Sequence, residues 1–249
     1  KNIFKITDEK LGIIKKNSTI IISKQKNNVF NYIKNKLKNK KNKKIFHKKD
    51  FKISINEKNK FEIIFEKKIQ SYSKPKLLGD HQIENATTAI ITILQLNKMG
   101  YSFSKKTINN GIIKTKWPGR LEYGKISNIK VYLDGAHNID GAIEIFKFFR
   151  NKKLKVWLVI GMLNNKNIYG FLKVIKPILN GLIAIPIPFE KNSLKQDKIL
   201  EASNKLKIRS LSCKSINEAN SYLVNKIKPK TILISGSLYL IGRVRNKFL

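Results

Sequence analysis

The strongest constraint on the fold is an alternation of short apolar runs with amphipathic segments, which begins after Trp117. The apolar runs predict buried strands at Val131–Leu133, Val156–Ile160, Leu182–Ile187, Ile208–Leu211 and Thr231–Ile234. The segments between them predict helices at 140–150, 168–179, 197–206 and 215–227, and a last helix at 237–247. Strands that are apolar throughout and alternate with helices are typical of a parallel sheet covered on both faces. The sequence therefore predicts an α/β fold, with a Rossmann-like domain at residues 117–249.

The first 116 residues have a mixed pattern and are predicted to form a separate domain. We expect a strand at 18–23, a helix at 27–40, a hairpin of strands 51–55 and 61–69 around a polar turn at 56–60, and helices at 82–98 and 104–113. The helix at 82–98 has an apolar face and an opposite face of uncharged polar residues, which includes His81 and Asn85. The polar face is either solvated or the wall of a cleft, and we favour the cleft.

The basic charge of the chain narrows the possible partners. The formal net charge is +36, yet only five of the 52 basic residues are arginine and lysine is spread over most of the 249 residues. A nucleic-acid reader more often uses arginine for bidentate contacts and interleaves exposed aromatic residues. We interpret the charge as compositional drift and expect no specific nucleic-acid partner. A lysine-rich nucleic-acid-binding protein remains the rival from a different class.

Two further features concern the compartment. No apolar run approaches the length of a membrane span, and the first residues lack the pattern of a secretory signal. The single cysteine, Cys213, excludes an internal disulfide and suits a reducing environment. We expect a cytoplasmic protein with no membrane partner, and a monomer.

Polar loops follow three of the predicted strands. They are Asp134-Gly135-Ala136-His137-Asn138, Gly161-Met162-Leu163-Asn164-Asn165-Lys166 and Ser235-Gly236-Ser237. Parallel sheets bind ligands beyond the carboxyl ends of their strands, so the three loops are expected to converge on one rim. A carboxylate and an imidazole there suit nucleotide, metal or second-substrate binding. The alternative for Asp134 is a tight turn in which its side chain caps the following helix.

An arginine precedes the first of these strands. Arg120 follows a Pro-Gly turn at the predicted domain border, within Trp117-Pro118-Gly119-Arg120-Leu121-Glu122. A guanidinium at that position suits a nucleotide phosphate, whereas the alternative is an exposed arginine in a linker.

Five ordered motifs resemble landmarks of the folylpolyglutamate synthase/dihydrofolate synthase family, a branch of the Mur ligases. They are His81-Gln82-Ile83-Glu84-Asn85-Ala86, the Trp117–Glu122 and Asp134–Asn138 segments, Gly161–Lys166 and Gly236-Ser237-Leu238-Tyr239-Leu240-Ile241-Gly242. Lys10, in Asp8-Glu9-Lys10-Leu11-Gly12-Ile13-Ile14-Lys15, resembles a further family motif. The resemblance implies the carboxyl-terminal part of a Mur-type ligase, with residues 1–116 as the tail of the central ATP-binding domain and 117–249 as a complete Rossmann-like domain.

The resemblance also implies residue roles and a reaction. Asn85, Arg120 and Asp134 match residues that contact ATP, His137 matches a residue tied to the incoming glutamate, and Ser237 is expected at the substrate rim. Lys10 matches a lysine that family members carry as a carbamate, which suits Mg²⁺. Lys10, Asp134 and His137 are the expected catalytic residues. The implied reaction is ATP-dependent ligation of L-glutamate to folate or dihydropteroate through an acyl phosphate, as tetrahydrofolate synthase and, as a second activity, dihydrofolate synthase.

The sequence departs from the family in one respect. The family's glycine-rich phosphate loop, Gly-x-x-x-x-Gly-Lys-Ser/Thr, does not occur in the 249 residues. We therefore expect the chain to be inactive alone and interpret it as a truncated record of a longer ligase, with a split or decayed gene as the competing explanation. Another Mur-type amino-acid ligase is the rival within the enzyme class, and a non-catalytic remnant is a third possibility.

Overall fold

The computed structural model describes residues 2–55 and 59–248. The chain divides into two compact units, one formed by residues 1–76 and 80–115 and the other by residues 77–79 and 116–249. Each unit has its own buried apolar clusters. The assignment of the first unit to a central ligase domain remains a prediction.

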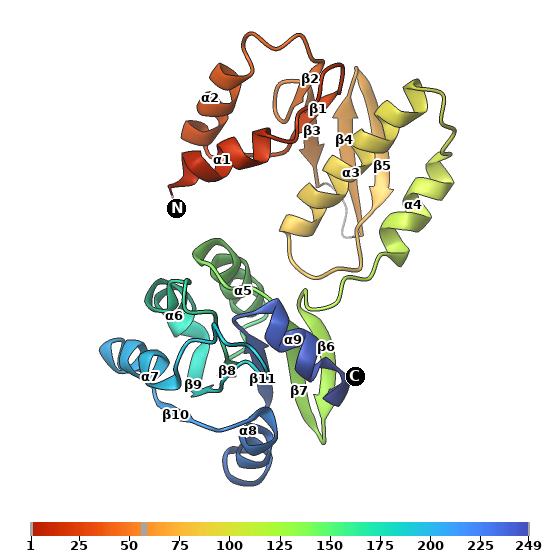
Figure 1. Cartoon of the computed structure of the whole chain (residues 1–249). Helices are drawn as coiled ribbons and strands as arrows, with labels where there is room; N and C mark the ends of the chain where they lie inside the picture. The colour runs from red at the N-terminus through yellow and green to blue at the C-terminus, as the bar shows by residue number, and fades with distance from the viewer. Residues whose placement is uncertain (1, 56–58, 249) are drawn as a thin grey trace. The chain divides into compact units, whose positions relative to one another are not determined.

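The first unit contains two small sheets and four helices among its described residues (Figure 1). In chain order its elements are α1 (Ile3–Leu11), β1 (Ile20–Ile22), α2 (Asn27–Lys36), β2 (Lys44–Phe46), β3 (Phe51–Ser54), β4 (Lys60–Phe65), β5 (Lys68–Ser73), α3 (His81–Lys98) and α4 (Lys105–Lys114). Strands β1 and β2 are parallel, and α2 connects them. Strands β3, β4 and β5 form an antiparallel sheet whose apolar side chains pack with those of α3 and α4.

Two predictions for the first unit were wrong. The segment 61–69 is not one strand, because the chain reverses at Glu66 and Lys67, where both residues have positive φ, and returns as β5. The predicted helix at 27–40 ends at Lys36, and the strand β2 follows it. The predicted polar turn at 56–60 lies partly outside the described residues.

The second unit is a six-stranded sheet between two layers of helices. Its elements are β6 (Glu122–Ile126), β7 (Ile129–Asp134), α5 (Ile139–Asn151), β8 (Val156–Ile160), α6 (Ile168–Ile175), β9 (Leu179–Ala184), α7 (Gln196–Lys205), β10 (Ser210–Ser212), α8 (Ile216–Tyr222), β11 (Thr231–Ser235) and α9 (Leu238–Val244). The strand order is β10-β9-β8-β11-β7-β6, and all neighbours are parallel except β6 and β7. The predicted α/β fold with a mainly parallel sheet is confirmed.

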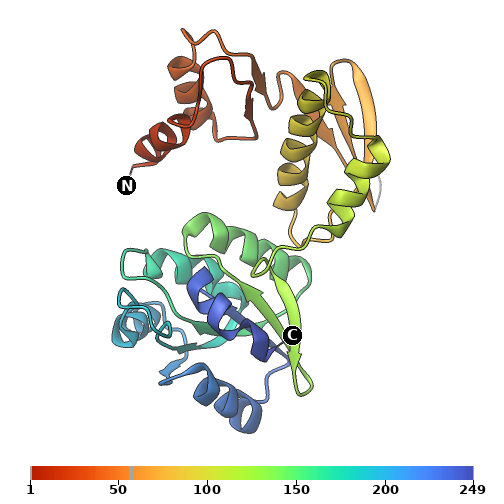
Figure 2. The same ribbon diagram turned by 45° about the vertical axis from the view of Figure 1, so that its right-hand side comes forward.

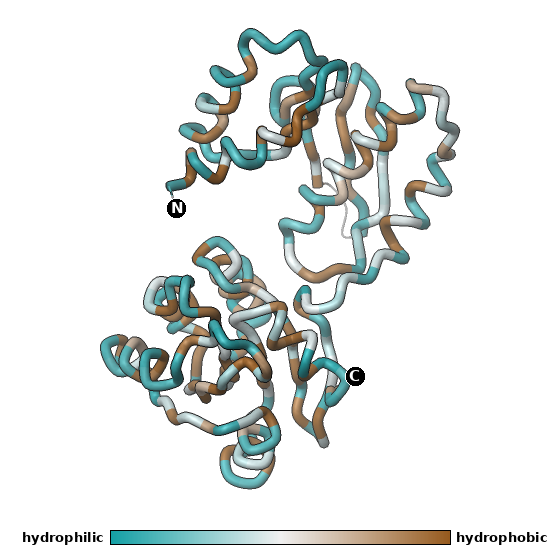
Figure 3. The backbone as a smooth tube through the Cα atoms, viewed as in Figure 1, coloured by the Kyte–Doolittle hydropathy of each residue, from teal (hydrophilic) through white to brown (hydrophobic). Residues whose placement is uncertain are grey.

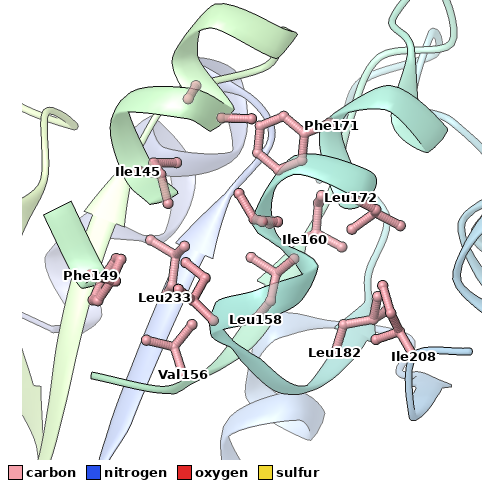
Figure 4. Packing of buried hydrophobic residues seen from close by; sticks show 14 of the residues in the cluster. Ile145, Phe149, Val156, Leu158, Ile160, Phe171, Leu172, Leu182, Ile208 and Leu233 are labelled. Carbon is pink, nitrogen blue, oxygen red and sulfur yellow. The ribbon is translucent and has the colours of Figure 1, made fainter. Parts of the chain in front are cut away.

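Apolar side chains explain why helices cover both faces of this sheet. On one face, α5, α6 and α7 bury Phe149, Phe171 and Ile199 in one cluster with alternate residues of the strands. Figure 4 shows Phe149 and Phe171 with Val156, Leu158 and Ile160 of β8. On the other face, α8 and α9 pack against the intervening residues of the same strands, and Figure 2 shows α9, in dark blue, lying over the sheet. Figure 3 shows brown, apolar segments along the strands, whereas the helices change between brown and teal along their length. Burial on both faces accounts for strands without polar alternation.

The direction in which the chain adds successive strands to the sheet changes once. From β7 the chain crosses to β8 and continues outward through β9 and β10, then returns to place β11 between β7 and β8. The carboxyl ends of β7, β11 and β8 consequently lie side by side, with Ser235 paired to both Asp134 and Ile160. In parallel sheets, ligands bind in the crevice that such a switch opens.

Candidate functional site

The three polar loops converge on one rim, as predicted. The backbone N–H of Gly236 donates to the carbonyl of Ala136 at 3.0 Å, and that of Gly161 donates to the carbonyl of Ser235 at 3.3 Å. The hydroxyl of Ser235, which is fully buried, also donates to the carbonyl of Ala136 at 3.2 Å. These bonds fix the loops after β7, β8 and β11 against one another.

Small residues permit the close approach of these loops. A Cβ atom on Gly135 would lie 2.2 Å from Cδ2 of Leu238, so α9 begins directly over the loop that follows β7. Gly236 has a φ of +108°, and a Cβ there would lie 2.6 Å from the carbonyl oxygen of Gly161. A side chain at Gly236 would push against the backbone of the loop after β8, and one at Gly135 would displace the side chain of Leu238.

Asp134 fastens the Arg120 loop to this rim. The buried carboxylate accepts the backbone N–H of Leu121 at 2.9 Å through Oδ2 and that of Ala136 at 2.8 Å through Oδ1. The N–H of Gly135 donates to the carbonyl of Gly119 at 2.8 Å. Asp134 does not cap α5, because Asn138 accepts the N–H of Gly141 in that role. These bonds of Asp134 fix the loop that carries Arg120, and the expected contact of Asp134 with ATP stays a prediction.

A second carboxylate secures the other side of the loop. Glu122 accepts the N–H of Gly119 at 3.0 Å and forms a two-pronged ion pair with Arg245, whose Nη2 lies 2.7 Å from Oε1. The Arg245 guanidinium is the main cause that holds the pKa of Glu122 below its ordinary value. Sequence reasoning missed this pair. The sequence signal for this pair is that arginine is rare in a lysine-rich chain. A planar guanidinium can form a bidentate pair with a carboxylate, and a lysine cannot.

The bonds of Asp134 and Glu122 hold the loop that carries Arg120. Three other arginines, Arg150, Arg209 and Arg243, lie over aromatic rings, and Arg245 pairs with Glu122. Arg120 is half-buried, and among the described residues its side chain has no hydrogen bond, ion pair or ring contact. A half-buried guanidinium on a fixed loop is suited to an anionic ligand.

His137 and Ser237 occupy the same rim. Nδ1 of His137 lies 3.0 Å from the carbonyl oxygen of Gly135, and a carbonyl only accepts, so Nδ1 carries the proton. The neutral imidazole then has its lone pair on Nε2. Ser237 is buried and caps α9, because its hydroxyl oxygen accepts the N–H of Tyr239 at 3.1 Å. Ser237 shapes the rim through this cap.

Comparison with known proteins finds a match within the second unit. Residues 119–238, slightly less than half of the chain, match the family described as Mur ligase, glutamate ligase domain. The matched residues include all four of Arg120, Asp134, His137 and Ser237.

Similar whole proteins extend this result beyond the domain. The chain is 29% identical over 196 residues to a dihydrofolate synthase/folylpolyglutamate synthase from Bacillus subtilis, covering 76% of this chain and 44% of that protein. It is 27% identical over 184 residues to a probable dihydrofolate synthetase from Schizosaccharomyces pombe, covering 69% of this chain and 43% of that protein. The chain thus spans less than half the length of these relatives.

Solved structures show the same fold. The folylpolyglutamate synthase of Thermotoga maritima has a TM-score of 0.75 at 26% identity, covering 98% of this chain and 57% of that one. The Mycobacterium tuberculosis folylpolyglutamate synthase, solved with ADP and AMPPCP, has a TM-score of 0.81 at 20% identity, covering 99% and 60%. The fold of both units is therefore that of the carboxyl-terminal part of these structures.

The remaining expected site residues, Lys10 and Asn85, lie in the first unit. Asn85 is exposed on α3, and its Nδ2 donates to Oε1 of Gln82 at 3.2 Å. Lys10 is exposed in the last turn of α1. That Asn85 shares a crevice with Arg120, Asp134 and His137 stays a prediction.

Within residues 2–55 and 59–248, no group of three or more His, Cys, Asp or Glu side chains could hold a metal ion. The expected Mg²⁺ site, which rests on a carbamate of Lys10, stays a prediction. The same part of the chain contains no helix that is both long and apolar enough to cross a membrane.

Proposed function

We propose that this chain takes part in the ATP-dependent ligation of L-glutamate to a folate, as the carboxyl-terminal part of a longer ligase. The similarity to dihydrofolate and folylpolyglutamate synthases supports this substrate pair over another Mur-type amino-acid ligase. The observation that carries the proposal is Arg120, a half-buried guanidinium that has no partner among the described residues and lies on a loop fixed by Asp134 and Glu122. It lies at the edge of the sheet where ligands bind in this class of fold.

ATP, when bound, supplies the phosphoryl group that converts the folate carboxylate into an acyl phosphate. Arg120 offers a fixed positive charge to phosphate oxygens, and the bonds from Asp134 hold its loop in place before the ligand arrives. Because Nδ1 of His137 donates to the carbonyl of Gly135, Nε2 is the ring nitrogen that is available to a substrate at the rim. Nε2 accepts a proton from the amino group of glutamate, whose nitrogen attacks the acyl carbon as phosphate leaves. The main contribution of the protein is orientation.

Several parts of the proposal rest on the family resemblance. Asn85 is proposed as a further ATP contact, and Ser237 as a substrate contact that acts from its capping position. Lys10 is proposed to carry a carbamate that binds Mg²⁺, and no step above depends on it. The proposed protein is a cytoplasmic monomer that accepts dihydropteroate, folate or both.

The decisive experiment compares the 249-residue chain with the longest reading frame that contains it. Each is incubated with ATP, Mg²⁺, labelled glutamate and either dihydropteroate or tetrahydrofolate, and glutamylated product is quantified by chromatography. We expect product from a longer frame that carries a phosphate loop and none from the 249 residues. Ligation by the short chain would disprove its inactivity, and a longer frame without any folate-dependent ligation would overturn the proposed function.

A substitution at Arg120 adds a more specific test to the same experiment. Arg120→Ala in the active frame should lower kcat/KM for ATP by roughly 100-fold, because one fixed charge at a transferring phosphoryl group is worth that much. Arg209→Ala is the matched control, since Arg209 lies over the ring of Trp157 and away from the rim. An equal loss in both variants would show that Arg120 has no specific role.

A further inference from the structure

A cavity lies in the first unit, and none of the residues that line it is a candidate site residue. It has a volume of about 290 Å³ and is lined by Ser23, Lys24, Asn27, His47, Lys48 and Lys49, among others. This volume is several times that of a water molecule and is close to the lower end for small-molecule sites. The cavity therefore has room for a small metabolite or for the charged end of a larger one.

The local topology places this cavity where ligands bind in α/β folds. Strands β1 and β2 are parallel, with Ile22 paired to Phe46, and the cavity residues Ser23 and His47 come directly after them. The N–H of His47 donates to the carbonyl of Ile22 at 3.0 Å, which holds the two strand ends together. Figure 1 shows β1, α2 and β2 as consecutive parts of one unit. The cavity thus lies beyond the carboxyl ends of a parallel strand pair.

The start of α2 provides a positive electrostatic potential that favours an anion. Asn27, the first residue of α2, lines the cavity, and this helix has ten residues. Within the described chain the N-cap residue Lys26 makes no side-chain cap, but Oδ1 of Asn28 accepts the N–H of Val29 at 2.9 Å, so only the first N–H groups of this turn face a ligand without a side-chain partner. The turn has no acidic residue. The first backbone N–H groups of a helix carry a partial positive charge and donate readily to phosphate or carboxylate oxygens.

The charged side chains at the cavity are mainly cationic. Lys24, Lys48 and Lys49 line it, and two carboxylates lie near. Glu84 pairs with Lys24 at 3.0 Å, and Asp50 accepts the N–H of Phe46 at 2.7 Å. His47 faces Glu84, Lys24 and Lys48, and burial is the main cause that lowers its pKa. At neutral pH the cavity therefore has a surplus of positive charge beside a mostly uncharged imidazole.

We infer that the cavity between β1, β2 and α2 binds a small, multiply charged oxyanion, the phosphate or carboxylate group of a metabolite. Lys24, Lys48 and Lys49 are exposed, and they line a concave site at the carboxyl ends of parallel strands, beside the start of a helix. The inference does not depend on the proposed ligase activity, because none of its residues belongs to the candidate site.

His47 provides a local probe of binding. The pKa values of the three histidines are measured by NMR titration of the 249-residue chain, in sodium chloride and then in pyrophosphate or citrate at equal ionic strength. An anion beside His47 stabilises the imidazolium, so its pKa should rise by about 0.5 or more. A rise with pyrophosphate alone assigns a phosphate ligand, with citrate alone a carboxylate ligand, and with both the shared chemistry. No rise with either anion would overturn the inference.

Two matched variants separate a site from the general charge of the protein. Lys48→Gln/Lys49→Gln should abolish the rise for His47 and leave the values for His81 and His137 unchanged. Lys105→Gln/Lys106→Gln removes the same charge from α4, which packs on β5 in the same unit, and should preserve the rise. A rise that survives in the first variant, or disappears in both, would show non-specific attraction to a chain of charge +36. Far-UV circular dichroism checks that each variant is folded.

Discussion

At the scale of single residues, a few specific contacts arrange the candidate site. Lysine is abundant but supplies mainly exposed charge, as in the pairs that Lys198 and Lys205 make with Glu201. Arginine and buried carboxylates supply the directed bonds, because a guanidinium fork matches a carboxylate and Asp134 accepts two backbone N–H groups. The position of Arg120 follows from those bonds.

The Glu122–Arg245 pair gives a test with a definite pH dependence. Glu122→Gln should lower the free energy of unfolding by about 1–3 kcal/mol at about pH 7, because it removes charge-assisted hydrogen bonds to Arg245 and Gly119. The pKa of Glu122 is lowered in the folded state, so its contribution is present above its unfolded value and is lost as the pH falls through the folded value. The difference between wild type and variant should shrink below pH 4.5. Urea unfolding across this range measures it.

Glu201→Gln is the control for this prediction. The pKa of Glu201 is also lowered, mainly by its hydrogen bonds to Lys205 and Lys198, but the group is exposed. Exposed pairs of this kind contribute little to stability, so the variant should unfold like wild type. Equal destabilisation by the two substitutions would contradict the special role given to Glu122.

At the scale of elements, the rim depends on how closely α9 approaches the loop after β7. Gly135→Ala should destabilise the protein by about 1 kcal/mol, because its Cβ would lie 2.2 Å from Cδ2 of Leu238 and the side chain of Leu238 must leave its packed position. Gly242→Ala, within the same helix, meets nothing within 4 Å and should stabilise by up to about 1 kcal/mol. Chemical unfolding of both variants checks the contrast. Similar effects in the two would show that the contact with Leu238 is unimportant.

The elements that sequence reasoning missed share a physical cause. The reversal at Glu66 and Lys67 has no glycine, asparagine or aspartate, the residues that normally mark turns with positive φ. Strand β6 contains Gly124 and Lys125 and exists through its pairing with β7. Neither element has a strong local signal, so only the neighbouring strand determines it.

At the scale of the whole molecule, each unit buries its own apolar clusters. In the second unit, helices from residues 116–249 cover both faces of the sheet, and Leu78 adds a contact from outside that range. We predict that a fragment of residues 116–249 folds on its own with a cooperative thermal transition, because a closed core is the physical requirement for independent folding. Near-UV circular dichroism and calorimetry test this. A fragment without a cooperative transition would show that the first unit is needed for the fold.

The sequence by itself determined the parallel sheet of the second unit and the residue types of its rim. Apolar runs and helical periodicity are local patterns, so they can be recognised without knowledge of the folded chain. Only the tertiary structure decided that β11 lies between β7 and β8, that Asp134 accepts the N–H of Leu121, and that Glu122 pairs with Arg245. Those contacts join residues up to 123 positions apart. No local pattern encodes them, because they form only when distant segments pack.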